Sequence, residues 1–309
     1  MSNALTQSHG EHNGKILFAH QLRAIAALFV LVIHLFGVYW LSRDLVAHHI
    51  FAPTLLGPSA KIYNIVHIEW FNFGPVGVAL FFLVSGFVIP FSLAKLVRLR
   101  FLAARALRIY PTYIACLSIS LFATWLSSRH WGIPFHWTWP TVVHNALLTN
   151  GIAGIENIDL VNWSLAIEIK FYFVACLMAS WINRGRILPL LIVSAGIGLF
   201  IGYVTYVLSP THNAIPLHIT TFYFDLIARD LLYIPFMFIG VVFCYHLRGQ
   251  ITRLQFLGST FLLFALFTAF WPMTVLKAQF PSVRLGYFEH NSVKVLLENW
   301  GHTFRWMHC

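Results

Sequence analysis

Charged residues are scarce in this chain. Only 10% of its 309 residues are charged, 59% are hydrophobic, and the mean hydropathy is +0.74. A soluble domain carries about 25% charged residues, because its surface must face water. The scarcity excludes an ordinary soluble domain and indicates that lipid is the solvent, so the bilayer is the first partner that we expect.

The motifs of many soluble enzymes are also missing. The chain has four cysteines and no Cys-x-x-Cys pair. It contains no Gly-x-Ser-x-Gly nucleophile elbow, no phosphate-binding Walker loop and no dinucleotide fingerprint. His48 and His49 are adjacent, but no third ligand follows at a useful spacing, and we therefore predict no metal site.

Long apolar runs are the main feature that is present. A bilayer core of ~30 Å needs about 20 apolar residues in a helix. Five runs of that size carry almost no charge, a sixth contains two charges, and a seventh is shorter and extends upstream. The runs are 24–42, 71–94, 109–128, 187–210, 254–276, 163–182 and 231–246. They predict an all-α polytopic membrane protein of about seven or eight spans, with a membrane domain at 1–276 and a tail without a span at 277–309.

The basic residues gather in the links between these runs. The link 95–108 is rich in Lys and Arg, and shorter basic links lie at 184–186 and 248–253. Because cytoplasmic loops carry an excess of Lys and Arg, we predict a multi-pass protein of the cytoplasmic (inner) membrane with a cytoplasmic N-terminus. The net charge of +10 is then explained mostly by this topology. Because the basic residues lie in short links between spans, we expect no binding of nucleic acid.

Two polar residues stand in or beside the first run. Arg23 and His34 are eleven residues apart, and eleven steps of ~100° come within about 20° of three full turns. They therefore share one helix face, about 16 Å apart along the axis. A cation near the cytoplasm and a base deeper in the membrane suit an anionic donor and a proton acceptor. Alternatively, Arg23 reaches to the interface and His34 makes an interhelical hydrogen bond.

The basic link contains a second candidate pair. Arg105 and Arg108 are three residues apart and share a helix face. Two guanidinium groups on one face make a good clamp for phosphate. The alternative is an anchor that only touches lipid headgroups, as basic loops of membrane proteins commonly do.

A carboxylate inside the run 163–182 is the third candidate. Glu168 lies about a turn and a half inside the outer end, at a depth similar to that of His34. A carboxylate can orient an imidazole and raise its basicity, and Ser164, one turn away, could share this network. An ion pair with Lys170 is the alternative, but residues two apart on a helix point away from each other.

Four sequence elements, taken together, resemble the membrane acyltransferase 3 family. They are Leu-Arg-x-Ile-Ala-Ala-Leu with a later His, Phe-Phe-x-x-Ser-Gly-Phe, Arg-x-x-Arg followed by Ile-Tyr-Pro, and Trp-Ser-Leu-x-x-Glu. They contain Arg23 and His34, Ser85 and Gly86, Arg105 and Arg108, and Trp163, Ser164 and Glu168. Close helix packing alone would explain the Ser-Gly pair. The order and the spacing are similar to those of the family over roughly residues 16 to 276.

The resemblance implies a donor, an acceptor and residue roles. Members use acyl-CoA from the cytoplasm, usually acetyl-CoA, and acylate hydroxyl groups of carbohydrates such as exopolysaccharide, lipopolysaccharide or glycolipid. It implies that Arg23 and His34 are needed for activity and that Arg105 and Arg108 lie near the CoA phosphates. We expect His34 to be the general base, with Glu168 orienting His34 or a neighbouring group. A covalent acyl-histidine intermediate is the alternative.

The chain also departs from the family pattern. His20-Gln21 stands where Asp-Gly is usual, and Ile169-Lys170 where Glu-Gln often follows. The family typically has about ten spans, so we expect its C-terminal helices to be missing here. An inactive truncated remnant is therefore one alternative. A transporter or channel with an intramembrane His/Arg/Glu relay is another, because such relays use the same residue types.

Overall fold

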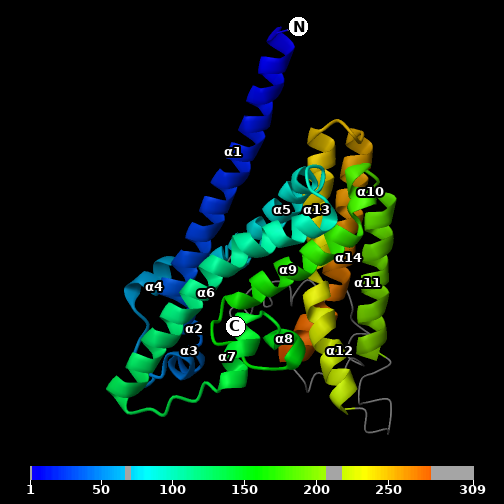
Figure 1. The fold of residues 1–309 in the computed structure, drawn as a ribbon. Coiled ribbons are helices and arrows are strands. Elements are labelled where there is room, and N and C mark those ends of the chain that lie inside the picture. Colours follow the sequence, from blue (N-terminus) through cyan, green and yellow to red (C-terminus); the bar gives the residue numbers. More distant parts are fainter. Residues whose placement is uncertain (1, 67–70, 207–217, 280–309) are drawn as a thin grey trace.

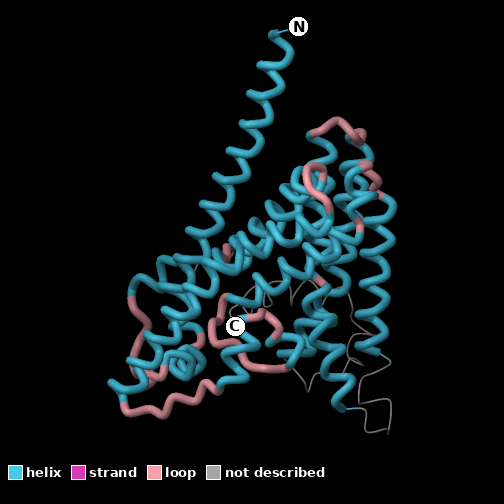
Figure 2. Tube along the Cα trace, in the orientation of Figure 1, coloured by secondary structure: helices cyan, strands magenta, loops and turns pink. Residues whose placement is uncertain are grey.

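The computed structural model describes residues 2–66, 71–206 and 218–279, and within these ranges every regular element is a helix (Figures 1 and 2). The all-α fold that the apolar runs predict is therefore confirmed. The predicted tail at 277–309 falls almost entirely outside the described residues.

Six helices in the described ranges are long and apolar enough to cross a membrane. These candidate spans are Leu17–Leu41, Phe73–Leu93, Arg98–Trp131, Leu188–Thr205, Leu226–Leu247 and Arg253–Pro272. They are formed by α1 (Ser2–Ile33) with a π-helical turn (His34–Val38) and α2 (Tyr39–Leu41), α5 (Phe73–Leu93), α6 (Arg98–Trp131), α11 (Leu188–Tyr206), α12 (His218–Leu231) with α13 (Tyr233–Leu247), and α14 (Arg253–Gln279). The chain is thus a polytopic membrane protein, and the run at 231–246 does extend upstream.

The predicted span at 163–182 is divided. It forms α9 (Asn162–Leu177) and α10 (Ala179–Asn183), because Met178 between them leaves the helical conformation at φ −84° and ψ 5°. The 16 residues of α9 measure about 24 Å, less than the ~30 Å of a bilayer core. Many of its side chains are buried among other helices, so α9 is a central helix that positions side chains inside the bundle.

The two ends of the molecule differ in what they carry. The basic links α5–α6, α10–α11 and α13–α14 lie toward the end that bears the N-terminus (Figure 1). Short helices gather at the opposite end, namely α3 (Arg43–Ile50), α7 (Trp139–Ala146) and α8 (Asn150–Ala153), while α4 (Lys61–Val66) packs against the turn that begins at His34. The basic links thus share one end, as a consistent alternation of spans requires.

Small residues bring α5 into close contact with its neighbours. A Cβ atom on Gly86 would lie 1.9 Å from the carbonyl oxygen of Met237 on α13, and one on Gly77 would lie 2.8 Å from a methyl group of Val30 on α1. Helix backbones approach this closely only where a side chain is absent. Close helix packing therefore does explain Gly86, and α5 is the element against which Arg23 of α1 is placed.

Candidate functional site

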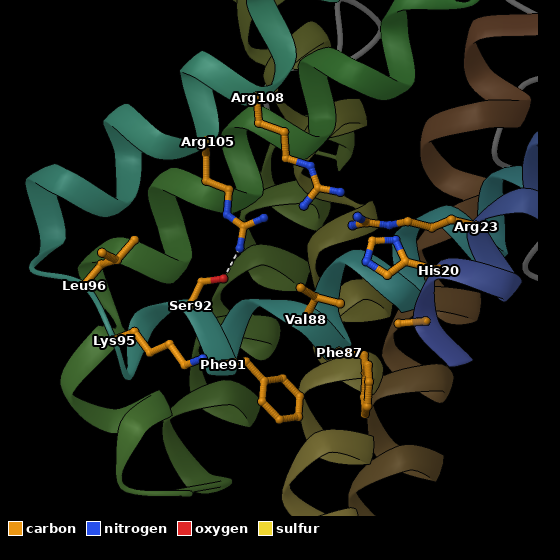
Figure 3. A pocket seen from close by; sticks show the side chains of 11 residues that line it. His20, Arg23, Phe87, Val88, Phe91, Ser92, Lys95, Leu96, Arg105 and Arg108 are labelled. Carbon is orange, nitrogen blue, oxygen red and sulfur yellow. Dashed lines mark hydrogen bonds between the residues drawn. The ribbon is translucent and has the colours of Figure 1, made fainter. Parts of the chain in front are cut away.

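A cavity of about 370 Å³ lies between α1, α5 and the start of α6. Figure 3 shows the side chains of Arg23, Arg105 and Arg108 converging on this space from two different helices. The lining consists of Ala19, His20, Arg23, Phe87, Val88, Phe91, Ser92, Lys95, Leu96, Arg105 and Arg108. The structure thus brings the predicted Arg105–Arg108 pair together with Arg23, which is far from it in sequence.

The cavity has a strongly positive lining. Arg23, Lys95, Arg105 and Arg108 are permanent cations, and the described residues that line the cavity include no Asp or Glu. His20 adds an imidazole to this lining. Such a lining concentrates positive potential and favours a ligand with several phosphate groups. The sequence motifs did not predict His20, Ser92 and Lys95 as part of this site, although Lys95 belongs to the basic link.

Arg105 is fixed in position by its surroundings. The guanidinium donates a hydrogen bond to Ser92 Oγ on α5 (dashed line in Figure 3) and lies 5.4 Å from the ring centres of both Phe101 and Tyr172. The residue is only 7% exposed, whereas Arg108 is exposed. A buried, stacked guanidinium presents its remaining N–H groups in a defined direction, which is the arrangement needed to bind an anionic oxygen.

Arg23 is held by a chain of hydrogen bonds that joins three helices. Its Nη2 donates to Ser85 Oγ of α5 at 3.4 Å, and this hydroxyl donates to Glu168 Oε1 of α9 at 2.5 Å. Tyr172 also donates its hydroxyl to Glu168 Oε1. Ser85 therefore does more than allow close packing. Tyr172 was missed, although its position one turn after Glu168 on the same helix face could have indicated the contact.

Glu168 does not contact His34. In the described part of the chain its hydrogen-bond partners are Ser85 and Tyr172, which lie at the level of Arg23. The prediction of a His34–Glu168 pair is therefore wrong, and its alternative, a neighbouring group, is what Glu168 orients. The reason is the start of α9. Asn162 is 4% exposed and bonds Asn145, so α9 begins inside the protein and Glu168 lies deeper than residue counting predicts.

Other predicted neighbours of Glu168 have separate partners. Ser164 donates to the carbonyl oxygen of Val161 at 3.1 Å and takes no part in the network. Trp163 packs its ring 5.8 Å from that of Tyr233, between centroids, and supports the helix contact there. Lys170 forms an ion pair with Asp230 at 2.8 Å. The expectation that Glu168 and Lys170 point to different partners is thus confirmed, whereas the role suggested for Ser164 is not.

His34 stands at a change in helix geometry. α1 is α-helical through Ile33, so Arg23 and His34 share a face, and the π-helical turn begins at His34 itself. Its Nδ1 lies 2.8 Å from the carbonyl oxygen of Val30. A carbonyl only accepts, so Nδ1 carries the proton and Nε2 keeps its lone pair. Single π-turns often occur at functional sites, and this one leaves a half-buried base with a defined tautomer.

Comparison with known proteins identifies the family of this chain. The family described as an acyltransferase domain matches residues 16–302, which include all of the predicted site residues. The chain belongs to the acyltransferase 3 family. No curated protein and no solved structure matches it. The match runs beyond residue 276, where we predict that the membrane domain ends. The chain is therefore a membrane acyltransferase, and the transporter alternative is not supported.

A second cluster lies at the other end of this acyltransferase. His48, His136 and Glu156 place one ligand atom each within 4.8 Å of one another. Folding brings these three residues together although they are far apart in sequence, so sequence spacing alone does not exclude a third ligand. Partial burial, and then the nearby His48, lower the pKa of His136. No residue of this cluster lines the basic cavity, and α3, which carries His48, lies at the end of the molecule opposite the N-terminus (Figure 1).

Proposed function

We propose that this acyltransferase moves an acyl group, acetyl in the first instance, from acyl-CoA to a hydroxyl of a carbohydrate such as exopolysaccharide or lipopolysaccharide. The observation that carries the proposal is the four-cation cavity that opens beside Arg23, on the helix face that also bears His34. One helix thus connects an anion-binding end to a general base about 16 Å away along the axis.

The basic cavity is the proposed site for the phosphate groups of the donor. Arg105 and Arg108 face them from α6, and Arg23 faces them from α1. Charge-assisted and bidentate hydrogen bonds to phosphate are among the strongest that a protein makes. The pantetheine arm of CoA is long and flexible, so the phosphates bind here while the thioester lies farther along α1, toward His34.

His34 is the proposed general base. Its Nε2 takes the proton from the acceptor hydroxyl as the hydroxyl oxygen attacks the thioester carbonyl carbon. When the tetrahedral intermediate collapses, the carbon–sulfur bond breaks and the proton passes from His34 to the CoA thiolate. The products are an ester and CoA. In the covalent variant, Nε2 itself attacks first and forms an acyl-histidine, which the hydroxyl then cleaves. The tautomer set by Val30 suits both routes.

The proposed orientation places the basic end in the cytoplasm of a cell with the protein in its inner membrane. This orientation rests on the basic links at that end and on the excess of Lys and Arg in cytoplasmic loops. The donor is then supplied from the cytoplasm, where acyl-CoA is made. The carbohydrate or glycolipid acceptor approaches His34 from the other side.

The test is transfer of radiolabel from acetyl-CoA in membranes that contain the protein. We expect label in a carbohydrate fraction with the unmodified protein and with His130→Ala, which changes an exposed histidine outside the site. We expect none with His34→Ala at equal expression. Label that persists in His34→Ala would contradict the role of His34. No label with the unmodified protein would contradict the proposed donor or acceptor.

A further inference from the structure

We propose that His48, His136 and Glu156 form a binding site for a divalent transition-metal ion of the Zn²⁺ class. The site lies at the end of the molecule opposite the basic cavity and plays no part in the acyl transfer described above. It joins three segments that are separate in sequence: α3, the link 132–138 and the link 154–161. None of its three ligands lines the cavity.

The spacing of the ligand atoms suits a tetrahedral ion. Two ligands at about 2.0–2.1 Å from tetrahedral zinc lie about 3.3 Å apart. His48 Nε2 is 3.4 Å from Glu156 Oε1, which is close to that edge length. One ligand atom from each of His48, His136 and Glu156 lies within 4.8 Å of the other two, and rotation of these exposed side chains would bring all three to one ion.

Contacts between aromatic rings bring the two imidazoles together. The rings of His48 and His136 are stacked at 4.5 Å with an interplanar angle of 23°. His136 also lies 4.5 Å from the ring of Phe51 and 4.4 Å from that of Trp137, between centroids. Phe51 ends α3 in the left-handed conformation, at φ 53°, which an aromatic residue rarely adopts. These contacts keep the two imidazoles side by side, and the rings turn out of the stack to bind one ion, because the lone pair of an imidazole nitrogen lies in the plane of its ring.

His49 supports the carboxylate ligand. This residue is buried, and its Nε2 lies 3.1 Å from the carbonyl oxygen of Asn157, the residue after Glu156. The same nitrogen is 3.6 Å from Glu156 Oε1. The contact ties the segment that carries Glu156 to α3. Groups that orient metal ligands in this way contribute strongly to metal affinity.

The ligand types select the class of ion. Imidazole and carboxylate together suit zinc and its neighbours in the transition series, whereas Mg²⁺ and Ca²⁺ prefer oxygen ligands alone. Three protein ligands leave the fourth tetrahedral position open to water. Because the ion binds segments that are together only in the folded chain, its binding stabilises this end of the molecule.

Calorimetric titration with ZnCl₂ tests the site in the purified full chain, held in detergent and first stripped of metal with a chelator. We expect one Zn²⁺ per chain, a rise in Tm on binding, and no response to MgCl₂. His136→Ala and Glu156→Gln should each weaken zinc binding by at least about tenfold, since loss of even a supporting group costs about 10- to 100-fold. His130→Ala, a nearby exposed histidine, should bind zinc as the unmodified chain does.

Two results would overturn the proposal. One is the absence of zinc binding in the unmodified chain. The other is equal zinc affinity in the unmodified chain, His136→Ala and Glu156→Gln, which would assign the ion to other histidines. Glu156→Gln keeps the size of the side chain, so it decides the question if His136→Ala fails to fold, as judged by its Tm without metal.

Discussion

Arg23 is held in position by the hydroxyl group of Ser85, which is in turn hydrogen-bonded to the carboxylate of Glu168. Burying a guanidinium without a partner is costly, and Ser85 and Glu168 together supply both a hydrogen bond and a compensating charge. Neither group lines the basic cavity, so in the proposed donor site both act through Arg23. In this account Ser85 and Glu168 are positioning residues, and Arg23 is the residue that contacts the donor.

Ser85→Ala and Glu168→Gln should therefore raise the KM for acetyl-CoA by similar amounts. A hydrogen bond to a charged group contributes about 1.5–3 kcal/mol, which corresponds to roughly tenfold to a hundredfold. Because both act through Arg23, the double variant should be little worse than the worse single variant. Kinetics of the three variants in membranes check this. If the KM increases of the two single variants multiply in the double variant, the two residues act independently. A lower Tm with an unchanged KM would likewise show that they do not act through Arg23.

Arg105 should contribute to donor binding and Arg100 should not. Arg105→Ala removes a buried guanidinium from the cavity, and we expect the KM for acetyl-CoA to rise about tenfold to a hundredfold, with a smaller effect on kcat. Arg100 lies on the same helix, is exposed and does not line the cavity, so Arg100→Ala is the matched control. Equal KM values for the two variants would argue against the assigned phosphate site.

At the scale of helices, the site depends on how closely α5 meets α13 and α1. Gly86 and Gly240 face each other across α5 and α13, where an added Cβ on Gly240 would lie 2.1 Å from the carbonyl oxygen of Leu83. This contact between α5 and α13 fixes the position of Ser85, the residue beside Gly86. Any separation of these helices would move Ser85 away from Arg23 and Glu168.

Gly240→Ala should consequently destabilise the protein by about 1–3 kcal/mol, because overpacking forces helices apart. Gly258→Ala, on the exposed face of α14, meets no atom within 4 Å and should leave stability unchanged or slightly raised. Thermal unfolding in detergent compares the two variants. A Tm for Gly240→Ala equal to that of Gly258→Ala would contradict the close contact.

Helices and shared faces were predictable from the sequence because they follow from local periodicity. The apolar runs and the Arg23–His34 face are examples. The break at Met178, the π-turn at His34 and the buried start of α9 were not predictable, because packing between distant helices determines them. The Glu168–His34 pair was wrong for that reason, and the His48–His136–Glu156 cluster was missed for the same reason.

The molecule as a whole places different chemistry at its two ends. Four cations gather in the basic cavity at the end that bears the N-terminus, and histidines and aromatic rings gather at the opposite end. His34 begins the π-helical turn that follows α1, between the two ends and about 16 Å from Arg23 along the helix axis. This polarity matches an acyltransferase that takes a phosphate-bearing donor on one side of the membrane and meets its acceptor on the other.

Transfer across sealed inside-out membrane vesicles tests whether His34 is needed to move an acyl group from a cytoplasmic donor to an acceptor on the other side. Labelled acetyl-CoA is added outside, where the proposed cytoplasmic end is exposed, and label is measured on carbohydrate inside. We expect internal label with the unmodified protein and with His130→Ala, and none with His34→Ala. Internal label with His34→Ala equal to that of the unmodified protein would contradict this expectation, as would label only on carbohydrate outside the vesicles.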